Sequence, residues 1–328
     1  MNYYKKHFIV LFLACYFFSG CAFISVDFGG RISPFKEKII SGTGADKILL
    51  LDISGIISQK SERGITNVKK ESGMVERIKE QLNKAEKDKK IKAIILRLNT
   101  PGGTVTASDM IYHELMEFKK KHDIKIIAAM MDISASGGYY IAMAADKILA
   151  HPTTITGSIG VLALKLNIKG LFEKIGVESE TIKSGDKKDS SSPFRPFTSE
   201  EKQIYQNIID SLFQGFVRVI QRGRKDLTRR DILKIADGRI YTAPQALKLK
   251  LIDQIGYLDD AINLTKIEAN LKEAKIISYY RPFQYKENIY SSYSPGGLGA
   301  AQTINILNID LNSFADKMST EFMYLWLP

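Results

Sequence analysis

The stretch Asp132–Val161, DISASGGYYIAMAADKILAHPTTITGSIGV, decides the interpretation of the whole chain. It follows a strand-like apolar run, Ile124–Met131, and passes through small residues into a short apolar helix expected over Tyr139–Ala145. A hydroxyl at such a junction lies beside backbone N–H groups that have no partner within the helix. These groups and the helix dipole favour negative charge. Ser136 is therefore a candidate nucleophile, and the N–H of Gly137 is a candidate oxyanion donor.

A second glycine-containing turn, Pro101-Gly102-Gly103, follows the buried run Ile91–Leu98 and precedes a helical pattern. Such a loop can aim a backbone N–H into the pocket beside Ser136 and so contribute to an oxyanion hole. Both turns also have a plainer interpretation, because glycine-rich strand–helix turns are common without catalysis. The first is not a Gly-x-Ser-x-Gly elbow. The two turns alone leave both interpretations open.

The pattern around these turns predicts an α/β fold. Lys47–Ile53 is a third apolar run with the length of a buried strand. Between the runs, apolar residues recur at helical spacing, first after a candidate cap at Ser72 and then after the Pro-Gly-Gly turn: Met74, Val75, Ile78, Leu82; Ile111, Leu115, Phe118. Strands and helices that alternate in short units predict a layered α/β architecture with largely parallel strands.

The chain has 328 residues, a net charge of +11, and two cysteines, Cys15 and Cys21, both near the N-terminus. Internal disulfides and thiolate metal sites are therefore excluded from the rest of the chain. The histidines lack metal-ligand spacing, so no metal or other cofactor is expected. The sequence contains no nucleic-acid-binding motif, and its basic excess fits a surface near anionic lipid better than a nucleic-acid partner.

Residues 1–26 are typical of an export segment. Lys5 and Lys6 precede the apolar run Phe8–Phe18, which is followed by Ser-Gly-Cys. Small residues before Cys21 indicate a lipoprotein signal that would leave this cysteine lipid-modified, whereas an uncleaved anchor over Phe8–Val26 is the alternative. We expect a linker over 27–46, a catalytic domain over 47–280 and a tail over 281–328.

The second half of the chain predicts a short strand over Glu178–Ile182, a polar loop, and a long helix that begins near Thr198 with a capping box to Glu201. The expected apolar face of that helix is Ile204, Ile208, Leu212, Phe216 and Ile220. Further helices are expected over Arg229–Ile235 and Ala243–Leu249. The tail ends in the apolar run Phe322–Leu327, which we expect to cover apolar surface near the site.

A serine hydroxyl needs a base to become a nucleophile. The histidines at 113, 122 and 151 have no context that favours this role. A lysine whose pKa is lowered can replace histidine, and the polar loop offers Lys183, Lys187 and Lys188. The residues alone do not select among them.

The four motifs PGG, ASGGYY, TGSIGV and KSGxxKD, in this order over Lys47–Tyr280, resemble the signal peptide peptidase A family. The resemblance implies a ClpP/crotonase-like fold and a Ser/Lys dyad. Its nucleophile would be Ser136 and its general base Lys188. It also implies that Ser158 orients the lysine and that Gly103 and Gly137 donate to the oxyanion. The adjacent Lys187 departs from the family pattern and leaves open which ammonium enters the site.

The resemblance further implies a serine endopeptidase at the bacterial cytoplasmic membrane, with its catalytic domain exported, that degrades cleaved signal peptides and other hydrophobic peptides. It implies a homo-oligomeric ring in which one protomer's lysine serves a neighbour's serine. Three alternatives remain: a peptidase of the same clan that cuts a specific membrane protein, a crotonase-like acyl-CoA enzyme, and a non-enzymatic membrane scaffold.

Overall fold

The computed structural model describes residues 33–60, 72–281, 289 and 321–327. The predicted export segment and its Cys21 lie outside the described residues. Within these ranges, none of the helices has the length and apolarity needed to cross a bilayer.

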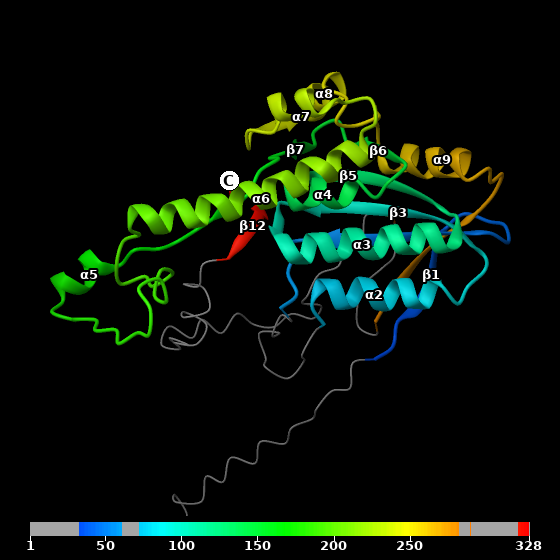
Figure 1. Ribbon diagram of the computed structural model, residues 1–328. Coiled ribbons are helices and arrows are strands. Elements are labelled where there is room, and N and C mark those ends of the chain that lie inside the picture. Colours follow the sequence, from blue (N-terminus) through cyan, green and yellow to red (C-terminus); the bar gives the residue numbers. More distant parts are fainter. Residues whose placement is uncertain (1–32, 61–71, 282–288, 290–320, 328) are drawn as a thin grey trace, which may run out of the picture.

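The described chain is built around a nine-stranded sheet in which most neighbours are parallel (Figure 1). Its main path runs β1-β11-β2-β3-β5-β6-β10, and β7 and β9 extend it beside β5. The strands are β1 (Lys36–Ser41), β2 (Lys47–Ser54), β3 (Ile91–Thr100), β5 (Lys125–Ala135), β6 (Lys147–Ala150), β7 (Ile155–Gly157), β9 (Ile240–Thr242), β10 (Gln254–Ile255) and β11 (Lys275–Tyr280). The predicted parallel α/β architecture is confirmed.

Helices cover both faces of this sheet, which explains why its central strands are continuous apolar runs. The helices are α2 (Met74–Ala85), α3 (Val105–His122), α4 (Gly137–Ala142), α5 (Lys169–Lys174), α6 (Ser199–Gly223), α7 (Arg229–Ile235), α8 (Ala243–Lys248) and α9 (Leu258–Glu268). Alternate residues of β2 enter different cores. Leu49 and Leu51 pack in the core of α2, α3 and α4, whereas Ile48 and Leu50 pack in the core of α9.

A second, three-stranded sheet lies at the carboxyl end of β3. It has the order β4-β12-β8, with β4 (Gly102–Thr104), β12 (Phe322–Leu325) and β8 (Leu162–Ala163). Both of its ladders are antiparallel, with β12 in the middle. The predicted apolar tail is thus a strand that joins two segments far apart in the chain.

Four expectations from the sequence were wrong. Residues Glu178–Ile182 form no strand; they are exposed, Ile182 to 97%, and no strand in the described part of the chain pairs with them. Ile204 and Ile208 are 40% and 38% exposed, because only the C-terminal half of α6 packs on the core. Gly73, not Ser72, is the N-cap of α2. Part of the expected linker over 27–46 is strand β1.

Strand β1 covers the edge of β11, from the Lys36–Tyr280 pair to the Ser41–Ile276 pair. A fragment that begins at residue 47 lacks this ladder, in which each net hydrogen bond stabilises the fold by about 0.5–1.5 kcal/mol. We therefore expect fragment 47–328 to unfold at a lower urea concentration than fragment 33–328, by circular dichroism. Coincident midpoints would mean that β1 adds nothing to the stability of the sheet.

Candidate active site

Ser136 lies where β5 ends and α4 begins, and its backbone has φ 52° and ψ −111°. A residue with a side chain rarely adopts positive φ, and such a conformation costs on the order of 1–3 kcal/mol. Two backbone bonds hold it: the N–H of Ser136 donates to the Gly157 carbonyl at 2.8 Å, and the N–H of Tyr140 donates to the Ser136 carbonyl at 2.9 Å. The residue is 1% exposed. The strained turn sets the direction of a buried hydroxyl at the start of a helix.

Strand β7 brings Ser158 beside this turn. The parallel ladder between β5 and β7 ends with Ala135 opposite Gly157, so the two serines follow directly after paired residues. Ser158 also has positive φ, 48°, and its N–H donates to the Arg239 carbonyl at 2.8 Å. Among the described residues, neither hydroxyl makes a hydrogen bond. Both therefore remain available to a further group.

The Pro-Gly-Gly turn lies against the same helix start. A Cβ built on Gly102, whose φ is +104°, would lie 2.8 Å from the Gly137 nitrogen. The loop is fixed from the other side, because the N–H of Ile57 donates to the Gly102 carbonyl and the N–H of Thr104 donates to the Ile57 carbonyl. A Cβ on Gly103 would meet that Ile57 carbonyl at 1.9 Å. The fold thus brings the motifs PGG, ASGGYY and TGSIGV together. Only glycine fits at positions 102 and 103.

Strand β12 runs along this turn and occupies the space beside it. Tyr324 pairs with Gly103, and the N–H of Trp326 donates to the Pro101 carbonyl at 2.9 Å. The Tyr324 carbonyl oxygen lies so close that a Cβ on Gly102 would be 2.0 Å from it and a Cβ on Gly137 would be 3.1 Å from it. A backbone carbonyl of the tail therefore lies next to the glycines that carry the candidate oxyanion donors.

The Tyr324 side chain fills an aromatic pocket. Its ring lies 5.1 Å from that of Tyr140 and 4.7 Å from that of Phe216, centre to centre, and its hydroxyl donates to the Leu212 carbonyl at 3.0 Å. The residue is 2% exposed, and burial raises the pKa of its phenol. As expected from the sequence, the tail covers apolar surface at the site.

The fourth motif lies elsewhere. Residues 164–198, with α5, extend beyond the sheet along the N-terminal half of α6 (Figure 1). In this arm Lys188 is exposed, and its ammonium forms no ion pair or hydrogen bond with any described residue. Lys187 is paired with Glu200, whose hydrogen bond raises the pKa of Lys187. The structure therefore distinguishes the two lysines by their contacts but does not bring either to Ser136 within one chain.

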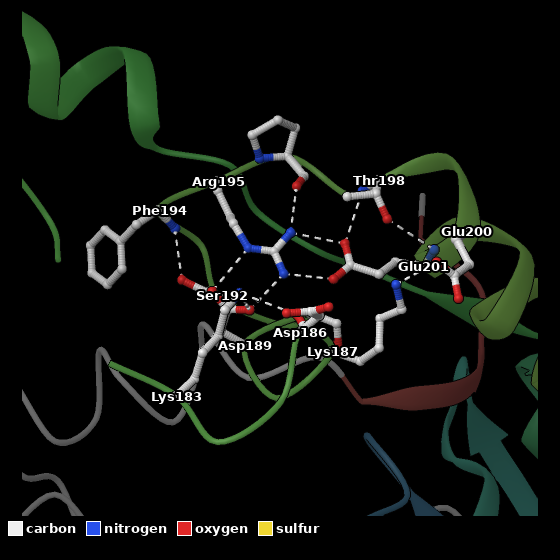
Figure 2. Close-up of polar contacts among 12 residues, drawn as sticks. Lys183, Asp186, Lys187, Asp189, Ser192, Phe194, Arg195, Thr198, Glu200 and Glu201 are labelled. Atoms are coloured by element: carbon white, nitrogen blue, oxygen red, sulfur yellow. Dashed lines mark hydrogen bonds and ion pairs between the residues drawn. The ribbon is translucent and has the colours of Figure 1, made fainter. Parts of the chain in front are cut away.

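A network of charged side chains holds residues 183–195, the lysine loop, against α6 (Figure 2). Arg195 bridges Asp189, at 2.7 and 3.0 Å, and Glu201, at 2.6 and 2.9 Å. Hydrogen bonds from Arg195 lower the pKa of Glu201 to about 2 and hold the pKa of Asp189 well below its ordinary value. From the sequence, Glu201 was expected only as the partner of Thr198 in a capping box. Its second contact, to Arg195, had no sequence signal.

Known protein families and individual proteins match this chain over much of its length. The model of peptidase family S49 matches residues 118–272, and the Clp protease model matches residues 55–155. An Enterococcus faecium relative whose name is that of a signal peptide peptidase SppA is 38% identical over 77% of this chain and 72% of its own. A chloroplastic serine protease SPPA of Arabidopsis thaliana is 32% identical over 84% of this chain and 40% of its own.

A ClpP1 variant from Listeria monocytogenes, among solved structures, is 18% identical, with a TM-score of 0.42 over 65% of this chain and 94% of its own. The Clp protease family match, together with the mixed α/β sheet, confirms the expected Clp-protease-like fold.

The depressed pKa of Glu201 predicts how pH acts on the lysine loop. Its ionised form stabilises the folded loop fully above the ordinary value of 4.5, and this stabilisation is lost as the pH falls through about 2. We expect the loop amides of Lys188, Ser190 and Ser192, which donate within the loop, to stay protected from hydrogen exchange at pH 5. Between pH 4.5 and 2 they should lose protection, after correction for intrinsic exchange, while amides of β3 keep theirs. Equal behaviour of both sets would contradict this.

Proposed function

The chain belongs to peptidase family S49 and is a serine peptidase, and from this premise we propose that Ser136 is its nucleophile and Lys188 its general base. The observation that carries the proposal is the strained, buried turn at Ser136, with Ser158 and two glycine turns converging on it. Strained backbone conformations cluster at active sites, where the surrounding structure holds them. Family membership favours this proposal over the acyl-CoA enzyme and the scaffold.

The proposed reaction proceeds in two steps. The neutral amine of Lys188 takes the Ser136 proton while Oγ attacks a peptide carbonyl, and the N–H groups of Gly103 and Gly137 stabilise the resulting oxyanion. The protonated lysine then gives its proton to the leaving amine as the peptide bond breaks. Water, activated by the same lysine, hydrolyses the acyl-enzyme and regenerates Ser136. Ser158 accepts or donates one hydrogen bond that orients the lysine.

We propose that the lysine comes from a second copy of the chain. Among the described residues, the hydroxyls of Ser136 and Ser158 make no hydrogen bond, and the ammonium of Lys188, on a projecting arm, has no partner. The arm carries apolar side chains exposed to solvent, which are typical of an interface: Leu164, Leu166, Leu171, Ile175, Val177 and Ile182. A ring of copies would bury these side chains and complete each site between two protomers.

Substrates would bind as an extended strand in the place of β12. The tail pairs with β4 and β8 through its backbone, so a peptide of many sequences could replace it. The pocket that holds Tyr324 would select an apolar or aromatic side chain beside the scissile bond. Hydrophobic peptides, including the signal peptides that the name of the E. faecium relative indicates, fit this pocket. The segment 1–26 would attach the protein to a membrane with its catalytic domain exported.

Substitution of the dyad tests the proposal directly. We expect Ser136→Ala to lower kcat on an apolar fluorogenic peptide by on the order of 10⁴-fold or more, and Lys188→Ala to lower it by roughly 10²–10⁴-fold. Lys187→Ala serves as the matched control, because its ammonium is already paired with Glu200; we expect nearly full activity. Full activity of Ser136→Ala would refute the nucleophile, and an inactive Lys187→Ala beside an active Lys188→Ala would move the base by one residue.

Removal of the tail strand tests the binding mode. An intramolecular segment competes at an effective concentration on the order of 1 mM, so deletion of residues 322–328 should lower KM for a short apolar peptide, roughly tenfold. Tyr324→Asp should act in the same direction, because it places a charge in the aromatic pocket without shortening the chain. Unchanged KM and unchanged solubility in the deletion variant would show that β12 does not occupy the substrate site.

A further inference from the structure

We propose that Arg195 is a positioning residue for catalysis: by bridging Asp189 and Glu201 it fixes loop 183–195 and so sets the direction in which Lys188 projects from the arm. The inference rests on the proposed role of Lys188 as the base. It concerns three side chains that do not touch the reacting atoms and whose effect would pass through the lysine.

All the hydrogen-bonding capacity of Arg195 is used within the arm. Its Nε and Nη2 donate to the Asp189 carboxylate, Nη1 and Nη2 donate to the Glu201 carboxylate, and Nη1 also donates to the Pro196 carbonyl at 3.1 Å. Arginine presents its donors in a planar fork that matches two carboxylates at once. The guanidinium therefore defines one relative placement of Asp189 and Glu201, which a flexible lysine at this position could not.

Glu201 anchors this bridge to the rest of the protein. It lies in the first turn of α6, its side chain is 1% exposed, and it accepts the N–H of Thr198 at 2.8 Å within the capping box. The same helix packs its C-terminal half into the core through Phe216 and Ile220. The loop is thus tied to a rigid element and not only to itself.

Asp189 transfers this placement to the adjacent Lys188. Its carboxylate also accepts Lys183 Nζ at 2.7 Å (Figure 2), and the Lys188 N–H donates to the Gly185 carbonyl in a tight turn. On the other side of the loop, Lys165 donates to the Ser190 carbonyl at 2.7 Å. Lys165 follows β8, which pairs with the tail strand β12, so the loop is attached to the three-stranded sheet as well as to α6.

The bridge also accounts for the charges around the lysine. A free carboxylate near an amine favours the ammonium form, which cannot accept a proton. Arg195 engages both Asp189 and Glu201, and Lys187 engages Glu200. Of the basic side chains of residues 183–195, Lys188 is left without a carboxylate partner among the described residues. The network therefore presents one unpaired amine in a defined direction.

Substitution of Arg195 in the full-length protein, purified in detergent, tests the inference. We expect Arg195→Met and Arg195→Lys each to lower kcat by about 100-fold, since misplacing a catalytic group by about 1 Å has this effect. KM should stay within about twofold, because β4 and β8, between which the substrate strand is proposed to bind, are untouched. Added guanidinium ion should restore part of the kcat of Arg195→Ala. The control Lys169→Met breaks an ion pair of the same arm, with Glu173 at 3.5 Å, and should keep full activity.

Asp189→Asn, which keeps the side chain's shape, should reproduce the loss and serves if the Arg195 variants fail to fold. Full kcat in the Arg195 and Asp189 variants would overturn the inference. So would a loss of activity that accompanies dissociation of the oligomer and resists guanidinium, because Arg195 would then be structural only. Lys188→Ala, measured in parallel, separates the two proposals: if it retains activity, the proposed base itself is wrong.

Discussion

The left-handed backbone of Ser136 is the constraint on which the site depends. The turn is unfavourable on its own, and it persists because β5, β7 and α4 hold it from three directions. Strand β7 supplies the Gly157 carbonyl for the serine N–H, and Gly138 leaves room for Thr100, whose methyl group would lie 2.7 Å from a Cβ. A central sheet buried on both faces provides the rigidity that this requires. The hydroxyl is thus placed before any substrate arrives.

Helix α6 connects the two halves of the proposed chemistry. Near its middle, the Leu212 carbonyl and the Phe216 ring form the pocket that holds Tyr324. At its N-terminus, Glu201 anchors the bridge to Arg195. One continuous helix therefore carries a wall of the substrate pocket and the support of the lysine loop. Its N-terminal half leaves the core, which is why Ile204 and Ile208, expected on a buried face, are exposed to solvent.

The sequence predicted the central sheet, because buried parallel strands are continuous apolar runs and these runs have the length of strands and alternate with helical patterns. It also indicated the glycine turns, because positive φ and close backbone contacts require glycine there, and it indicated the serine that lies beside them. The sequence did not predict strands that form only because they pair with a segment far away in the chain. Strands β1, β4, β8 and β12 are short or polar on one side, and only the ladders they form define them. Glu178–Ile182 has a similar composition but pairs with no strand that the structure describes.

The choice between Lys187 and Lys188 shows the same limit for the site. Adjacent lysines in a polar loop are equivalent by composition, and what separates them is the position of Glu200 and the direction of the chain at Asp189. Those depend on Arg195, whose two partners lie six residues away on either side. Among the described residues, the Lys188 amine on the arm has no partner, and the hydroxyls of Ser136 and Ser158 make no hydrogen bond. Unsatisfied groups of complementary chemistry on one chain are most simply explained if a second copy brings them together.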